Sequence, residues 1–179
     1  MNIIVLTGSP HKRGTSALLA DEFIRGAKKS GHNVFRFDAA FENVNPCIAC
    51  DYCRKKEGKC THTDAMEELY PKLIETDLIA FVTPLYYFGM TTQLKRVIDR
   101  FYAADNTLRN MQKRTILIAT GADSEVWAMD ALIKHYHAIN RYLGWKDVGN
   151  VLALGVSTRK DIEHTLFPQQ AYKLGLSLS

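Results

Sequence analysis

The residues best suited to redox chemistry or metal binding are four cysteines in the segment "CIACDYCRKKEGKC", and no other cysteine occurs in the chain. Their spacing is C-x2-C-x2-C-x6-C, formed by Cys47, Cys50, Cys53 and Cys60. Three thiolates at intervals of three can converge on one compact object, and bacterial runs that bind an iron–sulfur cubane begin with the same triplet. A [4Fe–4S] cluster is therefore one interpretation of this segment.

Other interpretations of the cysteines stay open. The fourth cysteine comes late, and Thr61 follows it where the bacterial run has proline. Structural zinc usually takes two C-x2-C knuckles separated by a longer loop, so zinc fits this spacing less well. The thiols can also form a dithiol/disulfide switch or bind no metal. His62 is more typical of a loop residue than of a ligand. Four cations near the thiols can offset negative charge, steer an acidic redox partner or simply face solvent: Arg54, Lys55, Lys56 and Lys59.

A second candidate site is the loop "TGSPHKRGTS" (7–16), which joins an apolar run to a helical pattern. Hydroxyls and the free N–H groups at a helix start can donate to phosphate oxygens. No G-x-G-x-x-G occurs, and Thr15 follows Gly14 where a P-loop has lysine. A hydroxyl-rich loop without that lysine fits a terminal monophosphate such as that of FMN. The alternative is a plain turn in which Ser or Thr caps the helix without any ligand.

The loop "TPLYYFGMTTQLK" (83–95) follows another apolar run and carries three consecutive aromatics. Consecutive side chains cannot all point inward, so we expect at least one aromatic to be available to a flat ligand. Gly89 would let the backbone approach a ring. In the alternative, Tyr86 and Phe88 are core residues and Tyr87 is an ordinary surface residue. A third loop, "TGADSE" (120–125), can bring Thr120 and Gly121 to the same ligand, and the alternative is a helix entry with Ser124 as its cap.

These loops need a parallel sheet to bring them together. Continuous apolar runs predict buried strands, and amphipathic runs between them predict helices. The predicted strands are 2–7, 33–38, 77–83, 114–120 and 148–156. The predicted helices are 15–29, 64–75 with a capping box from Asp64 to Glu67, 91–103, 124–143 and 168–176, with Pro71 able to kink or split the second. We therefore expect a doubly wound α/β fold with five parallel strands and helices on both faces. Ligands bind such folds beyond the carboxyl ends of the strands, where the loops 8–16, 84–90 and 121–124 lie.

The composition is that of an ordinary globular domain, with 46% hydrophobic and 23% charged residues over 179 residues. We expect a single domain over 1–179, with a cysteine-rich, insertion-like segment at 44–62. The net charge of +4 and the lack of a long basic block argue against a nucleic-acid partner. No run approaches a membrane span, and the start has no leader pattern, so we expect a cytoplasmic protein with reduced thiols and no membrane partner.

The motifs "GSPHKRGTS", "TPLYYFGMTTQLKRVIDR", "LIATGAD" and "LGWKDVG" together resemble the flavodoxin-like NADPH-dependent FMN reductase family. Within it the chain is most similar to the iron–sulfur flavoprotein branch and related cysteine-bearing NAD(P)H-dependent oxidoreductases. The resemblance spans about residues 3–175 and implies a flavodoxin-like fold with bound FMN. It places the FMN phosphate at Ser9, His11, Thr15 and Ser16. It places the flavin ring at Pro84, Leu85, Tyr86, Tyr87, Phe88 and Gly89, with Thr120 and Gly121 beside it.

The resemblance also implies details of the site and assembly. His11 stands where relatives often have Arg, and Lys12 or Arg13 can compensate for it. The four cysteines match a compact cluster-binding motif of the iron–sulfur flavoproteins, although many reductases of the family carry such cysteines without a cluster. A homodimer or homotetramer is expected.

The implied function is an FMN-dependent NAD(P)H oxidoreductase, which passes electrons through FMN to a small-molecule or protein acceptor, either directly or via a [4Fe–4S] cluster. The chemistry resides on the flavin, so no protein residue is expected to act as a catalytic acid, base or nucleophile. An FMN-binding electron carrier without nicotinamide turnover is the alternative, and the basic charge of the chain disfavours a plain flavodoxin. A thiol or metal sensor that uses the fold only as a scaffold is a third hypothesis.

Overall fold

The computed structural model describes residues 1–179 and contains one five-stranded sheet in the order β2-β1-β3-β4-β5. All neighbouring strands are parallel. The strands are β1 (Asn2–Thr7), β2 (Asn33–Asp38), β3 (Leu78–Pro84), β4 (Arg114–Thr120) and β5 (Lys146–Ala153). The predicted flavodoxin-like, doubly wound sheet is confirmed.

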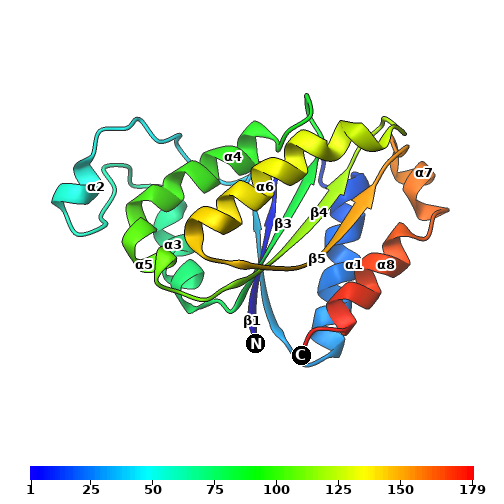
Figure 1. Ribbon diagram of the computed structural model, residues 1–179, viewed down its shortest axis with the longest axis horizontal. Coiled ribbons are helices and arrows are strands. Elements are labelled where there is room, and N and C mark those ends of the chain that lie inside the picture. Colours follow the sequence, from blue (N-terminus) through cyan, green and yellow to red (C-terminus); the bar gives the residue numbers. More distant parts are fainter.

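Helices cover both faces of the sheet (Figure 1). One face packs against α1 (Thr15–Lys29), α7 (Arg159–Glu163) and α8 (Phe167–Leu176). The other packs against α3 (Met66–Glu75), α4 (Thr92–Asp99), the 3₁₀ helix η1 (Arg100–Ala104), α5 (Asp105–Arg109), the 3₁₀ helix η2 (Val126–Met129) and α6 (Asp130–Leu143). A short helix, α2 (Tyr52–Lys55), lies within the cysteine segment.

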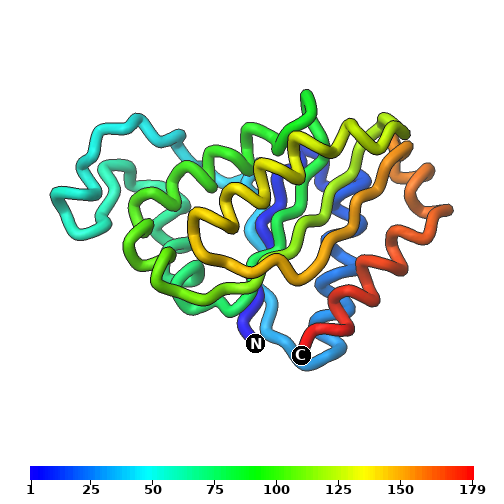
Figure 2. Tube along the Cα trace, viewed as in Figure 1, coloured from blue at the N-terminus to red at the C-terminus, as the bar shows by residue number.

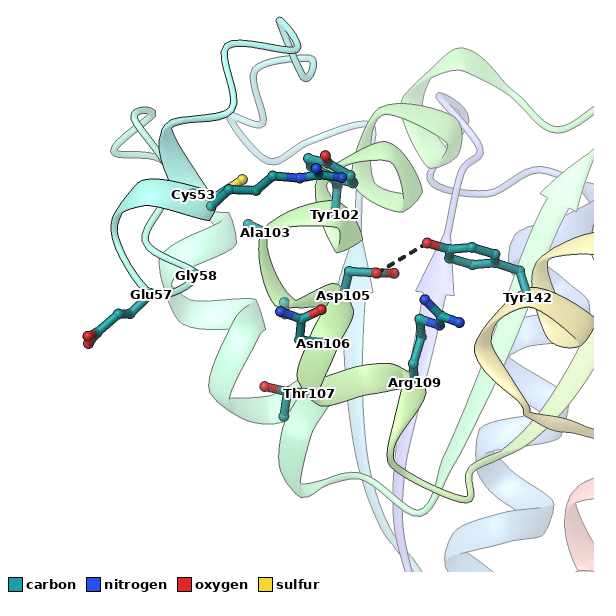
Figure 3. Close-up of a pocket in the computed structure, with 12 residues that line it drawn as sticks. Cys53, Glu57, Gly58, Tyr102, Ala103, Asp105, Asn106, Thr107, Arg109 and Tyr142 are labelled. Carbon is teal, nitrogen blue, oxygen red and sulfur yellow. Dashed lines mark hydrogen bonds between the residues drawn. The ribbon is translucent and has the colours of Figure 1, made fainter.

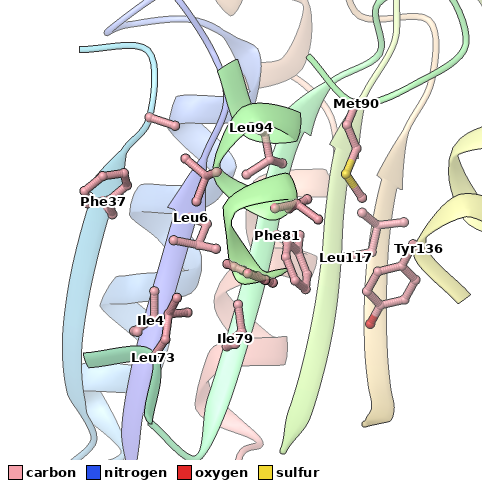
Figure 4. Close-up of a cluster of buried hydrophobic side chains, with 14 of the residues drawn as sticks. Ile4, Leu6, Phe37, Leu73, Ile79, Phe81, Met90, Leu94, Leu117 and Tyr136 are labelled. Atoms are coloured by element: carbon pink, nitrogen blue, oxygen red, sulfur yellow. The ribbon is translucent and has the colours of Figure 1, made fainter. Parts of the chain in front are cut away.

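The alternation of side chains along each strand divides the core into two clusters. In β1, Leu6 belongs to the cluster under α3, α4 and α6, whereas Val5 belongs to the cluster under α1 and α8. Figure 4 shows the first cluster, in which Leu6, Phe81 and Leu94 lie between the sheet and α4. Because successive strand residues point to opposite faces, both faces can be buried only if both residue sets are apolar. This explains the continuous apolar runs in the sequence.

The start of α3 differs from the prediction of a capping box at Asp64. The helix begins at Met66, its N-cap is Ala65, and no capping box joins Asp64 to Glu67. The Asp64 carboxylate accepts a hydrogen bond from the Met66 N–H at 3.1 Å and also forms a buried ion pair with Arg100, so it serves the helix start and a tertiary contact together. Pro71 lies inside α3 without splitting it.

Three other predicted boundaries were wrong. The helix predicted over 91–103 ends at Asp99 and continues as η1, and the helix predicted over 124–143 begins as η2. The strand predicted over 148–156 occupies Lys146–Ala153, because its polar first residues pair with β4 while Gly155 turns the chain with φ +70°. The elements α2, α5 and α7 are too short to show a periodic pattern.

The cysteine segment extends from one end of the long axis of the molecule, whereas the two termini lie close together at the amino edge of the sheet (Figure 2). Arg96 of α4 holds the chain that leads into this segment, since its Nη2 donates to the carbonyl oxygens of Ala39 (2.7 Å) and Glu42 (3.1 Å). No helix of the protein has the length and apolar character needed to cross a membrane.

Candidate functional site

A cavity of about 600 Å³ lies at the carboxyl edge of the sheet, where the loops after β1, β3, β4 and β5 meet. This volume is typical of small-molecule and cofactor sites. Eight of the residues predicted to bind FMN line it together: Ser9, His11, Thr15, Pro84, Leu85, Tyr86, Thr120 and Gly121. Loops distant in the sequence therefore form one site, as the parallel topology requires.

The first turn of α1 faces this cavity without a side-chain cap. Gly14 is the N-cap residue and makes no capping bond. The Ser9 Oγ accepts from the His11 N–H (3.1 Å), and the Thr15 hydroxyl bonds to that of Thr120 (2.9 Å). The alternative of a Ser or Thr helix cap is therefore wrong, and the N–H groups of this turn stay free for an anion.

Ser16 is the most informative residue of this turn. Its side chain is 1% exposed, and its Oγ has no hydrogen-bond partner in the protein. A buried hydroxyl without a partner costs free energy, so its presence at an open helix start indicates a ligand-binding role. Ser16 does not itself line the cavity, and its contact with FMN stays a prediction.

The charge of the cavity favours an anionic ligand. Lys12, Arg13 and Arg159 line it, and no Asp or Glu does. Arg159 was not among the predicted site residues, because the fifth strand was predicted to end at residue 156 and the short helix α7 after it was not predicted. Its position just after a parallel strand could have identified it, since the loops after such strands lie at the ligand-binding edge.

The aromatic loop forms a tight hairpin beside the cavity. Tyr86 and Gly89 exchange two backbone hydrogen bonds of 3.1 Å, and the two residues between them have positive φ, 49° for Tyr87 and 64° for Phe88. Tyr86, Tyr87 and Phe88 are 45%, 100% and 41% exposed. The prediction of an available aromatic is confirmed, and the alternative with Tyr86 and Phe88 in the core is wrong.

Three residues of the predicted ring loop do not line the cavity: Tyr87, Phe88 and Gly89. Phe88 instead stacks on Trp127 of η2, with ring centroids 5.2 Å apart. Their contact with the flavin ring stays a prediction. The hairpin and η2 together form an exposed aromatic patch, defined by Tyr86, Tyr87, Phe88 and Trp127.

The four cysteines line a second, small cavity. All four are free thiols, with Cys47 and Cys50 exposed and Cys53 and Cys60 half-buried. Burial raises the pKa of the Cys53 thiol, and the neighbouring Cys60 and Cys47 raise it further. No group of three or more Cys, His, Asp or Glu side chains is arranged to hold a single metal ion. A cubane distributes four thiolates over four irons, so the donor set that shares this cavity fits a cluster better than a single ion.

Arg100, which lines this cysteine cavity, forms a buried ion pair with Asp64. The Arg100 Nη1 donates to the Asp64 Oδ2 at 2.7 Å, with both side chains at most 1% exposed. Burial acts to raise the pKa of Asp64, but hydrogen bonds from Arg100, Asn45 and Met66 outweigh it and lower that pKa to about 2. Burial acts to lower the pKa of Arg100, but Asp64, Tyr70 and Cys60 raise it overall. The pair is therefore ionised, and Arg100 lies close enough to interact with Cys60.

A third cavity, of about 620 Å³, adjoins the cysteines (Figure 3). Cys53 and Tyr102 border one side, and Arg109 and Tyr142 border the other. The Tyr142 hydroxyl donates to the Asp105 carboxylate at 3.1 Å. Opposite charges line this cavity, so it has no simple charge preference.

Comparison with known families decides the family of the chain. A model of the NADPH-dependent FMN reductase family matches residues 1–158. The chain belongs to this family. The chain spans about half to two thirds of the length of the first curated relatives it matches.

The relatives of this FMN reductase family member include iron–sulfur flavoproteins and an NAD(P)H-dependent oxidoreductase, the two groups that the chain resembles in its motifs. An iron–sulfur flavoprotein of Methanocaldococcus jannaschii is 36% identical over 56% of this chain and 51% of its own length. A Bacillus subtilis protein described as an NAD(P)H-dependent FMN-containing oxidoreductase is 25% identical over 87% of this chain and 86% of its own. An NAD(P)H:quinone oxidoreductase from Methanothermobacter marburgensis has the same fold, with a TM-score of 0.78 at 16% identity over 100% of this chain and 96% of its own.

The cavity at the sheet edge fits the cofactor that gives the family its name. A phosphate needs free N–H groups and cations, which the start of α1, Lys12 and Arg13 supply. A flat ring needs a wall without bulky projections. At Gly121, a Cβ would lie 3.3 Å from the Met129 Cε and 3.4 Å from the Leu85 Cδ2, so a larger residue would press on these two side chains.

Proposed function

We propose that this protein is an FMN-dependent NAD(P)H oxidoreductase that carries a [4Fe–4S] cluster on its four cysteines and passes electrons to a small-molecule or protein acceptor. The observation that carries the proposal is the uncapped start of α1, which faces a cation-lined cavity and carries the buried, unpartnered Ser16 hydroxyl in its first turn. Bound FMN would accept a hydride from NAD(P)H and release electrons singly or in pairs, which is chemistry no side chain of the protein provides.

The protein's part at the phosphate end is binding. The N–H groups of the first turn of α1 and the hydroxyls of Ser9 and Ser16 would donate to phosphate oxygens. Lys12, Arg13 and Arg159 would neutralise its charge. Gly14 keeps the turn tight, because a Cβ there would lie 3.1 Å from the His11 Cβ.

At the ring end the protein orients the cofactor and limits access to it. Pro84, Leu85 and Tyr86 form one wall of the cavity, with Thr120 and Gly121 beside them. The Leu85 N–H donates to the Thr120 carbonyl oxygen at 2.7 Å, which fixes the two walls relative to each other. The exposed aromatic patch next to this wall offers flat surface on which a nicotinamide ring can stack.

The cysteine cavity supports the cluster part of the proposal. Its four cysteines line one small cavity, Arg100 holds the chain at Asn45 just before them, and no disulfide consumes the thiols. The adjoining third cavity gives an acceptor access to Cys53 (Figure 3). A cluster here would serve as the exit for single electrons.

The decisive experiment is purification without oxygen, followed by a visible spectrum and assays of acid-released flavin, iron, sulfide and NAD(P)H oxidation. We expect FMN near one per chain, iron and sulfide at about four per chain, and oxidation of NADH or NADPH with a quinone or ferricyanide as acceptor. Colourless protein that takes up no FMN contradicts the proposal. Flavin without turnover favours the electron-carrier alternative, and flavin with turnover but without iron leaves a simple reductase.

A second test isolates the phosphate end. The wild-type apoprotein should bind FMN much more tightly than riboflavin, because only FMN offers a phosphate to α1. The double variant Lys12→Gln/Arg13→Gln should lose most of this difference while binding riboflavin as before. Lys173→Gln, an exposed cation on α8, is the matched control and should keep it. Equal affinity of the wild type for both flavins would exclude a phosphate site at this loop.

A further inference from the structure

The cysteine cavity is lined by two further side chains that each have one buried nitrogen atom without a hydrogen-bond partner. Arg100 and His62 line it together with all four cysteines. The Arg100 Nε and the His62 Nε2 are both buried, and neither has a hydrogen-bond partner in the protein. A buried donor without an acceptor is costly, so two of them at one cavity indicate an acceptor that the protein chain does not supply.

The orientation of Arg100 is fixed by its other nitrogens. Nη1 donates to the carbonyl oxygen of Asn45 (2.8 Å) and to the Asp64 Oδ2 (2.7 Å), and Nη2 donates to the Asp64 Oδ1 (3.3 Å). Asp64 is held in turn by the backbone N–H groups of Asn45 (2.9 Å) and Met66 (3.1 Å). Asp64 and Asn45 thus hold the guanidinium through Nη1 and Nη2, and the Nε N–H is left without a partner in a side chain that lines the cysteine cavity.

The acceptor that fits these donors is sulfur carrying negative charge. Thiolates and bridging sulfides of a cluster accept hydrogen bonds, and such bonds are a main way in which proteins set a cluster's potential. The charge of Arg100 is balanced by Asp64, so the site adds directed donors rather than a large excess of positive charge.

We propose that Arg100 and His62 are positioning residues that donate hydrogen bonds from Nε and Nε2 to the sulfurs of the cluster held by the four cysteines, and that they raise its reduction potential. This inference rests on the proposed cluster. When the cluster takes up one electron, no bond forms or breaks, but negative charge on its sulfurs increases. Hydrogen-bond donors therefore stabilise the reduced form more than the oxidised form.

The chain offers a matched control for Arg100. Arg141 is an exposed arginine of α6 and lines neither the cysteine cavity nor the cavity at the sheet edge. Arg100→Lys keeps the positive charge beside Asp64 but removes the Nε donor, and Arg141→Lys makes the same change away from the cysteines. At His62, the variant His62→Leu removes the donor, whereas His62→Gln keeps an N–H.

The experiment is an anaerobic redox titration of the cluster signal, read by visible absorption and electron paramagnetic resonance, on protein of known iron and sulfide content. We expect Arg100→Lys and His62→Leu to lower the midpoint potential and the double variant to lower it further. Arg141→Lys and His62→Gln should titrate like the wild type. If Arg100→Lys does not fold, the two His62 variants carry the same comparison.

Two results would overturn the inference, and they are distinguishable. Wild-type potentials in iron-replete Arg100→Lys and His62→Leu would remove the role of these residues while the cluster stands. Wild-type protein with flavin but no iron or sulfide would remove the cluster, and this role with it.

Discussion

At the scale of single residues, a change at Ser16 should affect FMN affinity without lowering the free energy of unfolding. Its hydroxyl is buried and unpartnered in the protein, so Ser16→Ala should leave the free energy of unfolding of the apoprotein unchanged or raise it by up to about 1 kcal/mol. The same change should weaken FMN binding about 10- to 100-fold, because a hydrogen bond to a charged group contributes roughly 1.5–3 kcal/mol. Flavin fluorescence titration and urea unfolding measure the two quantities.

Ser124→Ala is the control for this prediction, since Ser124 is exposed and lies in the third loop without lining the cavity. It should change neither quantity. A loss of stability in Ser16→Ala without a loss of FMN affinity would show that the hydroxyl serves the fold and not the ligand.

Asp64 gives a prediction for pH. Burial acts to raise its pKa, yet hydrogen bonds from Arg100, Asn45 and Met66 lower it to about 2 from an ordinary 3.8. Because the folded pKa lies below the unfolded one, the stabilisation is present above about pH 4 and is lost as the pH falls through about 2. The wild type should lose about 2 kcal/mol of unfolding free energy from this group between pH 5 and pH 2.

Asp64→Asn cannot lose that contribution. The free energy of unfolding of Asp64→Asn should therefore fall furthest below that of the wild type near neutral pH, where Arg100 lacks its charged partner. This difference in free energy should shrink by about 2 kcal/mol toward pH 2. Urea unfolding over this pH range is the measurement. Glu75→Gln, which alters an exposed carboxylate without an ion pair, should show a constant difference, and a constant difference for Asp64→Asn would refute the prediction.

The residue types explain why some site residues were predictable and others were not. Cys47 and Ser9 carry chemistry that is visible in the spacing of one segment. Arg100 does not, because in "VIDRF" it reads as a polar position of an amphipathic helix, and only the fold brings it under the cysteines. His62 was named, but whether its Nε2 had a partner depends on packing that no local pattern encodes.

At the scale of elements, the buried strands were the most predictable part. The bounds of β1 and β4 follow directly from their apolar runs, because strands covered on both faces must be almost wholly apolar. The bounds of β2, a partly exposed edge strand, were also predicted correctly. The edge strand β5 was misplaced because its first residues, Lys146 and Asp147, gain their place by pairing with β4 and not by burial. The positive φ of Tyr87 and Phe88 was not predictable, since aromatic residues rarely adopt that conformation.

Gly8 tests how the elements around the phosphate loop fit together. A Cβ at this position would lie 2.3 Å from the Thr91 Oγ1 and 2.7 Å from the Leu94 Cβ, and the Thr91 hydroxyl donates to the Gly8 carbonyl oxygen while capping α4. Gly8→Ala should therefore push α4 away from β1, lower the free energy of unfolding by about 1–3 kcal/mol and weaken FMN binding.

Gly89→Ala is the matched change in the hairpin. A Cβ there would meet only the Tyr86 carbonyl oxygen, at 3.9 Å, and the residue has no positive φ. It should be tolerated in both stability and flavin affinity, as judged by thermal unfolding and FMN titration. If Gly89→Ala abolished FMN binding while Gly8→Ala did not, the backbone of the hairpin and not the packing of α4 would control the site.

At the scale of the whole molecule, the exposed aromatic patch favours self-association of the chain. The cysteine segment extends from one end of the long axis, and α7, whose first residue Arg159 lines the cavity at the sheet edge, lies at the other (Figure 1). Beside that cavity lies the aromatic patch, with Tyr87 fully exposed and Trp127 57% exposed. Contiguous exposed aromatics of this kind typically mark an interaction site. A self-association that covers this patch would account for it and would close the ring side of the cavity.

The expected homodimer or homotetramer is therefore testable through the patch itself. Light scattering of the holoprotein should give a mass of two or four chains, and Phe88→Ser/Trp127→Ser should shift it toward one chain, because truncation of buried aromatic anchors removes much of an interface's binding energy. Ile74→Ser, which removes a partly exposed apolar side chain on α3, should leave the mass unchanged. A monomeric wild type would leave the patch free for the nicotinamide or a redox partner, and the steady-state KM of the double variant for NAD(P)H and for the acceptor would then show which of the two it serves.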